Sequence, residues 1–205
     1  RPHHTIRRRK PKGNTYPQNL YRENCGQGEL GSIILGDMTV LYLARHGETV
    51  DNANQILQGQ TQGMLNEKGQ EQAENLAKSL DGIHIDAVIA SDLKRAVDTA
   101  EVIAKRRSLP LITTPLLRER DWGAFTGRFI PDLKDVQWPD DVESMDAMME
   151  RARLFMDWLR RDYSQQTVVA VGHGIINKVI QAVYHNTRTN KIPRMTNAEV
   201  RKLIL

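Results

Sequence analysis

The chain has 205 residues, 40% of them hydrophobic and 26% charged, which is ordinary for a globular protein and enough for one domain with a sizeable core. Residues 1–37 hold 7 of the 29 basic side chains and 3 of the 25 acidic ones, so the net charge of +4 belongs to this segment and the remainder is neutral. No apolar run approaches the roughly 18 to 20 residues that cross a bilayer, and no apolar h-region follows the first basic residues, so we expect neither a transmembrane protein nor a secretory signal.

Residues 1–37 are predicted to be a basic, poorly ordered N-terminal extension. They contain three prolines, five glycines and a basic cluster over residues 7–12, and they bury too little apolar surface to offset the entropy lost on ordering. The cluster is interpreted as a solvated arm. A nucleic-acid patch is the alternative, but the neutral charge of residues 38–205 argues against nucleic acid as a partner. The single cysteine, Cys25, excludes an internal disulfide and fits a reducing compartment, so we expect a cytoplasmic protein with no membrane partner.

Residues 39–49 combine an apolar strand with a basic pair. The first six, T-V-L-Y-L-A, are mostly β-branched or apolar and too few for a helix, which predicts a core strand of an α/β sheet. Arg45, His46 and Gly47 follow at its carboxyl end, where parallel sheets collect ligands, and Gly47 is expected to let the backbone turn. A cation beside an imidazole at this place favours phosphate chemistry, although an isolated Arg-His pair is more often part of a surface loop.

Helices and strands alternate along the rest of the chain. Asn66 is the predicted N-cap of a helix that ends near Leu80, and the next helix carries Arg95 in its first turn. A longer helix is expected over residues 144–163 and an apolar one after Gly174. The further predicted strands are residues 87–90, 111–113, 167–171 and 199–205, the last at an edge. The predicted fold class is therefore α/β, a three-layer sandwich with a mostly parallel central sheet and helices on both faces.

Chemically active side chains follow four of the predicted strands. Arg45 and His46 follow the first, Arg95 the second, Glu119 lies in a loop after the third, and His173 follows the fourth. Right-handed crossovers would bring these strand ends to one rim of the sheet. Two histidines and a glutamate suit zinc or iron, but two arginines in the same cluster would repel a cation and attract an anion. A phosphoryl group fits that field and the geometry of guanidinium, so we predict a phosphate site with no metal and no cofactor.

These segments resemble, in order, the motifs of the histidine phosphatase superfamily, also called the phosphoglycerate mutase-like proteins. Residues 45–49, R-H-G-E-T, are similar to the family signature, and Asn52 lies where the family places a phosphate-contacting asparagine. Residues 91–96, S-D-L-K-R-A, resemble its second phosphate-binding segment, residues 117–119 with Gly123 and Gly127 its acid loop, and residues 172–174, G-H-G, its closing motif. The resemblance covers residues 38–205, which we interpret as the histidine phosphatase domain.

The resemblance implies a two-step transfer of phosphate. His46 would attack phosphorus and form a phosphohistidine, while Glu119 would protonate the leaving oxygen and then assist water. His173 would complete the catalytic group, and the arginines would keep His46 unprotonated by disfavouring a third positive charge. The implied substrate-binding residues are Arg45, Asn52, Arg95 and Gly174. With His173, Arg45, Asn52 and Arg95 would hold the phosphate oxygens on which charge accumulates.

Two departures from the family pattern bear on the reaction. Val142 stands where relatives often have glycine in Gly-Glu-Ser, and the connection over residues 128–142 is short. Mutases need longer covering segments to protect phosphohistidine from water, so we predict a phosphatase acting on a small phosphorylated metabolite. A phosphoglycerate mutase and a protein phosphohistidine phosphatase are the alternatives. A silent scaffold is disfavoured because every predicted catalytic residue is present, and a homodimer is left open.

Overall fold

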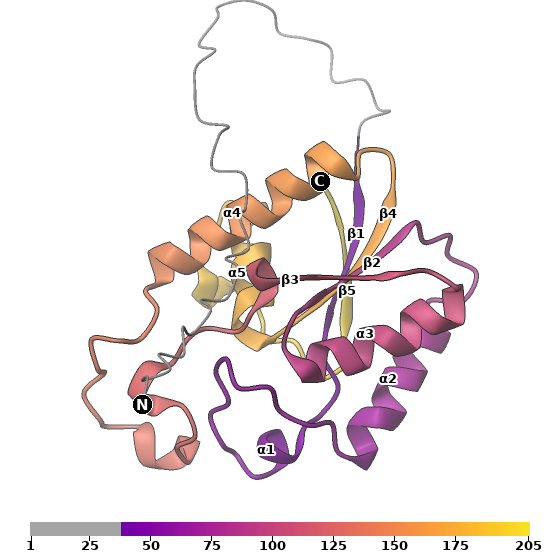
Figure 1. The fold of residues 1–205 in the computed structure, drawn as a ribbon. Coiled ribbons are helices and arrows are strands. Elements are labelled where there is room, and N and C mark those ends of the chain that lie inside the picture. Colours follow the sequence, from indigo (N-terminus) through magenta and orange to yellow (C-terminus); the bar gives the residue numbers. More distant parts are fainter. Residues whose placement is uncertain (1–37) are drawn as a thin grey trace, which may run out of the picture. The chain divides into compact units, whose positions relative to one another are not determined.

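The structure is a computed structural model that describes residues 38–205 (Figure 1). The predicted poorly ordered extension over residues 1–37, its basic cluster and Cys25 lie outside the described residues. The division of the chain between residues 37 and 38 therefore stays a prediction. None of the helices in the described part combines the length and hydrophobicity that spanning a bilayer requires.

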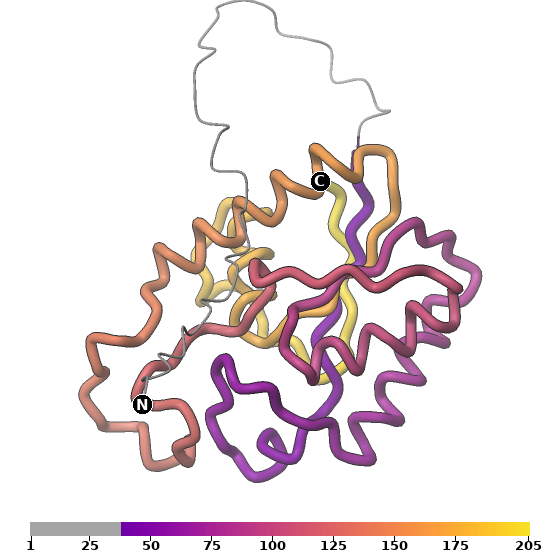
Figure 2. Tube along the Cα trace, in the orientation of Figure 1, coloured from indigo at the N-terminus to yellow at the C-terminus, as the bar shows by residue number. Residues whose placement is uncertain are grey.

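Within residues 38–205, five strands form one sheet in the order β3-β2-β4-β1-β5. They are β1 (Val40–Arg45), β2 (Ala87–Ser91), β3 (Leu111–Thr114), β4 (Thr167–Gly172) and β5 (Val200–Ile204). The first four are parallel to one another, and β5 runs antiparallel to β1. Figure 2 shows β1 between β4 and β5. The predicted mostly parallel sheet with a last edge strand is confirmed.

Two pairs of helices cover the two faces of this sheet. The helices are α1 (Val50–Ala53), α2 (Glu67–Ser79), α3 (Lys94–Arg107), α4 (Met145–Asp162) and α5 (Gly174–Tyr184). The pair α2 and α3 packs on one face and the pair α4 and α5 on the other (Figure 1). This arrangement is the predicted three-layer sandwich.

Alternation along the strands divides the apolar side chains between two cores. In β4, Val168 and Ala170 belong to the core under α4 and α5, whereas Val169 and Val171 belong to the core under α2 and α3. All four side chains are fully buried, as expected for a parallel strand covered on both faces. Burying the strand on both sides fixes its register, because a slip by one residue would exchange the two faces.

The topology opens a crevice between the carboxyl ends of β1 and β4. These strands are hydrogen-bonded neighbours, with Arg45 opposite Gly172 in the register. The chain continues from β1 toward α2 on one face and from β4 directly into α5 on the other. Ligands bind at such a switch point because the two connections diverge there. His46 and His173 are the residues that leave the two strands.

Several short elements were not predicted. The single-turn helix α1 exists through a capping box in which Thr49 and Asn52 bond each other's backbone N–H groups. The four 3₁₀ turns in the described part of the chain are equally short. They are η1 (Pro115–Leu117), η2 (Gly123–Phe125), η3 (Ile130–Leu133) and η4 (Thr189–Lys191). One turn leaves no periodic hydrophobic pattern to detect.

Gly47 is needed for close packing rather than for the turn that the sequence suggested. A Cβ atom on Gly47 would lie 2.4 Å from the backbone oxygen of Gly69 in α2, and one on Gly69 would lie 1.9 Å from the backbone oxygen of Glu48. Two glycines therefore let the segment after β1 press against the first turn of α2. This contact positions the backbone immediately after His46.

We expect Gly69→Ala to destabilise the protein by about 3 kcal/mol, because the added methyl group would force two backbone segments apart. Urea unfolding followed by circular dichroism would measure the change. The neighbouring exposed substitution Gln70→Ala is the control and should shift the free energy of unfolding by no more than about 0.5 kcal/mol. Equal stability of the two variants would contradict this account of Gly69.

Candidate active site

The structure brings the predicted site residues to one edge of the sheet. A cavity of about 230 Å³ is lined by six of the seven, namely Arg45, His46, Asn52, Arg95, Glu119 and Gly174. The seventh, His173, is fully buried, and its ring centroid lies 5.0 Å from that of His46. Residues more than 120 positions apart in the chain therefore meet where the topology opens its crevice. Their individual roles stay predictions.

His46 is held in one orientation by its own neighbour. Its ring nitrogen Nδ1 lies 2.7 Å from the carbonyl oxygen of Gly47. A carbonyl can only accept a hydrogen bond, so Nδ1 carries the proton and Nε2 keeps its lone pair. The side chain is 2% exposed, which leaves little freedom for the ring to move. This arrangement prepares Nε2 as a nucleophile.

Both histidines are kept neutral. Burial lowers the pKa of His46 well below its ordinary value of 6.5, and the charges of Arg95 and Arg45 lower it further. The pKa of His173 is lowered in the same direction, again mainly by burial and then by Arg95 and His46. The arginines thus act as the sequence suggested, but desolvation is the larger cause. A neutral imidazole is the form that can attack phosphorus.

Arg45 and Arg95 each have a buried hydrogen-bond donor that the described part of the chain leaves unpaired. The Nε atoms of Arg45 and Arg95 are buried and have no hydrogen-bond partner within residues 38–205. Both ring nitrogens of His173 are likewise buried and have no hydrogen-bond partner there. Buried polar atoms are normally paired, so four such atoms within one cluster indicate a place where a ligand supplies the acceptors. Burial lowers the pKa of Arg95 to about 10, so its guanidinium is charged at neutral pH.

The guanidinium group of Arg95 also holds a loop in place, a role that was not predicted from the sequence. Its Nη1 donates to the carbonyl oxygens of Thr61 and Gln62, and its Nη2 donates to that of Gly59 at 2.8 Å. Three of the five guanidinium N–H groups are therefore used to hold the loop over residues 59–62. The Nε–H and one Nη2–H remain for a ligand.

Glu119 lies at the N-terminus of α5. The backbone N–H of Ile175 lies 3.2 Å from each carboxylate oxygen, and the N–H of Ile176 lies 3.3 Å from Oε1. Negative charge is favoured at this end of a helix. A Cβ atom on Gly174 would lie 3.6 Å from Oε2 of Glu119 and 3.7 Å from Nε of Arg45, so both side chains face Gly174. The carboxylate of Glu119 and the guanidinium of Arg45 thus border the same space beside Gly174.

Asn52 lines the cavity, but most of the hydrogen-bonding groups of its amide already have partners in the protein. Its Oδ1 accepts from the backbone N–H of Thr49 and from Nδ2 of Asn197, and its own Nδ2 donates to Gln58 at 3.3 Å. One N–H of its amide remains for a ligand. The predicted contact with phosphate is therefore limited to a single donor.

The segment before β5 completes the site, a role that was not predicted from the sequence. The carbonyl of Met195 accepts from Nη1 of Arg45 at 2.7 Å. Nδ2 of Asn197 donates to the carbonyl of His46, and the N–H of Ala198 approaches the carbonyls of Arg45 and His46. No sequence signal marks these contacts, because most of them use backbone atoms.

The loop that carries Glu119 is fixed on both sides. Arg151 on α4 forms a two-point ion pair with Glu143, with both nitrogen–oxygen distances at 2.8 Å. Its Nη1 donates to the carbonyl of Arg118, and the carbonyl of Glu143 accepts from Nε of Arg120. The residues directly before and after Glu119 are therefore tied to one ion pair. This clamp, formed by Arg151 and Glu143, positions the acid loop.

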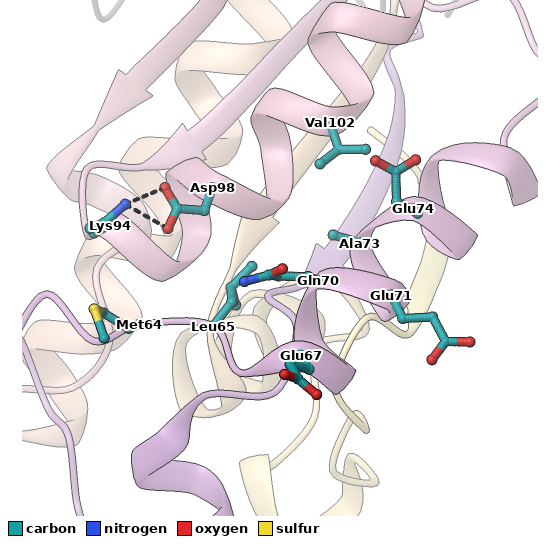
Figure 3. A pocket seen from close by; sticks show the side chains of 10 residues that line it. All are labelled: Met64, Leu65, Glu67, Gln70, Glu71, Ala73, Glu74, Lys94, Asp98 and Val102. Carbon is teal, nitrogen blue, oxygen red and sulfur yellow. Dashed lines mark hydrogen bonds and ion pairs between the residues drawn. The ribbon is translucent and has the colours of Figure 1, made fainter.

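A larger groove of about 710 Å³ lies elsewhere, between α2 and α3 (Figure 3). Three glutamates of α2 line it, Glu67, Glu71 and Glu74, and its lysine, Lys94, is paired with Asp98 at 2.7 Å. The acidic lining would repel a phosphate ester. None of the predicted site residues borders this groove, so the smaller cavity is the candidate active site despite its size.

The site suits an anion better than a metal ion. Within residues 38–205, no group of three or more His, Cys, Asp and Glu side chains is arranged to hold a metal. The cluster instead offers two guanidinium groups, two imidazoles and one carboxylate. Such a constellation at the carboxyl edge of a parallel sheet suits the binding of a phosphoryl group.

Comparison with known proteins identifies the family. The family model of the histidine phosphatase superfamily (branch 1) matches residues 41–205. The chain therefore belongs to the histidine phosphatase superfamily, as its motifs suggested, and is a hydrolase of phosphomonoesters by that membership.

Individual relatives carry phosphatase and mutase names. A metal-independent phosphoserine phosphatase of Arabidopsis thaliana is 33% identical over 182 residues, which cover 80% of this chain and 75% of the relative. The phosphoglycerate mutase-like protein 4 of the same plant is 31% identical, with 80% and 78% covered. A mycobacterial glucosyl-3-phosphoglycerate phosphatase of known structure superposes with a TM-score of 0.73 at 25% identity, covering 82% of this chain and 90% of its own.

The lowered pKa values of the two buried histidines predict that stability falls in mild acid. Below about pH 6.5 the unfolded chain takes up a proton on each histidine, whereas the folded protein does not, so acid favours unfolding. Between pH 6.5 and 5 we expect a loss of about 1 kcal/mol per pH unit for each histidine. Urea unfolding at several pH values would measure it.

A double variant provides the control for this pH dependence. His46→Asn/His173→Asn removes both buried imidazoles but keeps two polar side chains in their place. Its free energy of unfolding should vary less over the same pH range than that of the unaltered protein. Identical pH dependence in the two proteins would mean that other groups cause the loss of stability.

Proposed function

We propose that the protein is a metal-independent phosphatase that hydrolyses small phosphomonoesters through a phosphohistidine on His46. The observation that carries the proposal is the imidazole of His46, neutral and fixed through Gly47, beside buried arginine donors that have no partner among residues 38–205. An ester phosphate placed there would meet a nucleophile and positive charge at once. The cavity of about 230 Å³ favours a small substrate.

In the first step, Nε2 of His46 attacks phosphorus and the bond between phosphorus and the ester oxygen breaks. Arg45, Arg95 and His173 donate to the oxygens that carry the charge of the transition state, which is the main source of catalysis in phosphoryl transfer. The carboxylate of Glu119 takes the proton that a monoanionic substrate phosphate brings and passes it to the leaving oxygen, and the alcohol departs. The products of this step are the alcohol and a phosphohistidine.

In the second step, water takes the place of the alcohol. The carboxylate of Glu119 accepts a proton from the water as its oxygen bonds to phosphorus, and the bond between phosphorus and Nε2 breaks. Inorganic phosphate leaves with that proton, so both His46 and Glu119 return to their starting protonation states. The two arginines supply the positive charge that a metal provides in other phosphatases, so the proposed reaction needs no metal.

Phosphoglycerate mutase activity is the second candidate, because several relatives carry mutase names. A mutase must keep water from its phosphohistidine until the second substrate alcohol attacks. The segment over residues 128–142 borders the cavity at Ile130, yet Phe129, Ile130 and Trp138 are between 42% and 52% exposed. This open border supports hydrolysis. Measuring isomerisation of 3-phosphoglycerate against release of inorganic phosphate separates the two reactions.

We expect His46→Ala to abolish phosphate release from a panel of phosphomonoesters assayed with EDTA present. In the unaltered protein, a short reaction with a ³²P-labelled ester should leave label on the chain that is lost in acid and retained in alkali, as a phosphohistidine requires. The exposed histidine variant His84→Ala is the control and should keep full activity. Turnover by a folded His46→Ala protein would disprove the proposed nucleophile.

The proposed acid predicts a dependence on the leaving group. Glu119→Gln should lower kcat/KM, which reports the first step alone, by about 10² to 10⁴ for alkyl phosphates, whose leaving oxygen needs a proton, and much less for p-nitrophenyl phosphate. Steady-state kinetics with both esters would test this. Glu67→Gln, an exposed carboxylate in the distant groove, is the control and should change neither rate. A uniform loss with both esters would assign Glu119 another role.

A further inference from the structure

One polar side chain lies behind the active site among core residues. Asn177 in α5 is fully buried, as are Ile176 and Ile180 of the same helix. Its Oδ1 is buried and has no hydrogen-bond partner among residues 38–205. Leaving a buried acceptor unpaired lowers stability, and an apolar side chain of the same shape would avoid that cost. Stability of the core therefore does not explain why an asparagine stands here.

The amide of Asn177 lies between the ends of β1 and β4. Its Nδ2 donates to the carbonyl oxygen of Ala44 at 2.9 Å, and Ala44 directly precedes Arg45. A Cβ atom on Gly172 would lie 2.2 Å from its Oδ1, so the amide packs against the backbone directly before His173. The missing side chain of Gly172 leaves the space that the amide fills. One side chain thus contacts both strands where they lead into the catalytic residues.

The hydrogen-bond ladder between β1 and β4 ends at the same place. The N–H of His46 donates to the carbonyl of Gly172 at 3.1 Å, and beyond this bond the chain leaves the two strands on opposite faces of the sheet. The backbone N–H of Asn177 donates to the carbonyl of His173 at 3.2 Å in the first turn of α5. The side chain of Asn177 therefore joins the helix that follows His173 to the strand that carries His46.

The same amide also contacts the segment before β5. Nδ2 of Asn177 lies 3.7 Å from the sulfur of Met195. Nε2 of Gln181, one turn further along α5, lies 3.5 Å from that sulfur and 2.9 Å from the carbonyl oxygen of Asn177. A thioether sulfur is only a weak acceptor, but the carbonyl of Met195 is the partner of Arg45. Asn177 thus contacts all three segments that hold the reactive groups.

We propose that Asn177 is a positioning residue, which sets the separation of His46 and His173 by joining the strand ends through one buried amide. It is not among the residues that line the cavity, so it acts through the residues it holds rather than on the substrate. Phosphoryl transfer needs the nucleophile and the donors in a narrow geometry, and a misplacement of about 1 Å can cost about 10²-fold in rate. The inference rests on the proposed phosphatase function and adds a residue outside its cavity.

Asn177→Leu keeps the branched shape of the side chain and removes its N–H donor. It should lower kcat/KM for p-nitrophenyl phosphate by about 10- to 100-fold while circular dichroism shows a folded protein. The decisive measurement is the ratio of the inhibition constants of vanadate and inorganic phosphate. Vanadate adopts the five-coordinate geometry of the transition state, so a misplaced nucleophile should weaken vanadate about tenfold more than phosphate. This ratio does not depend on how much of the protein is active.

Ile180→Val is the control for stability. It removes one methylene group from a fully buried side chain of the same helix, so it should lower the midpoint of thermal unfolding but leave the ratio of inhibition constants unchanged. If Asn177→Leu does not fold, Asn177→Ala takes its place, because it removes the amide without adding volume. An unchanged ratio in a folded Asn177 variant would overturn the proposal, whether or not its stability or rate has fallen.

Failure of this inference can be distinguished from failure of the proposed function. Hydrolysis that is abolished by His46→Ala but unaffected by Asn177→Leu would refute the positioning role alone. Absence of hydrolysis for every ester would refute the function, and the ring ¹⁵N signals of His46 and His173 would then decide the role of Asn177. Those signals should shift in Asn177→Leu and stay in place in Ile180→Val. Unshifted signals in a folded Asn177→Leu protein would overturn the positioning role.

Discussion

The burial of two guanidinium groups beside two imidazoles is the constraint on which the rest of the site depends. Arg95 is 1% exposed and Arg45 is 7% exposed, and Glu119 is the carboxylate at their side. Removing such charges from water is costly unless the protein supplies acceptors. The loop over residues 59–62 supplies carbonyls to Arg95, and Met195 supplies one to Arg45. The shapes of these segments thus follow from the need to provide hydrogen-bond acceptors for the two arginines.

The same constraint explains how the site is prepared for chemistry. Because the arginines are held by backbone carbonyls before any ligand arrives, their remaining donors need little reorganisation when a phosphate enters. Their charge and burial also keep His46 neutral, so one physical cause serves both the binding of an anion and the reactivity of the nucleophile. The clamp of Arg151 and Glu143 likewise holds the loop of Glu119 in position before a ligand arrives.

Much of the fold, and the set of residues that line the site, could be predicted from the sequence. Asn66 and Ser144 cap α2 and α4 through their side chains, and the buried runs of β1, β2 and β4 have the predicted bounds within about two residues. Strand ends converge in a parallel sheet, so the motif residues could be expected to meet. The contacts that hold them could not be predicted: the Met195 carbonyl has no signature, and the packing of Gly47 against Gly69 depends on where α2 comes to lie.

The contribution of the segment before β5 has a consequence for biosynthesis. All the family motifs, through Gly174, precede Met195, Asn197 and β5 in the chain and are therefore translated before them. Until then Arg45 lacks its carbonyl partner, and β1 lacks a neighbour on one edge. The nascent chain therefore carries every reactive group without the framework that orients them. A product terminated before residue 195 would therefore carry an intact set of motifs without the contacts that orient Arg45 and His46.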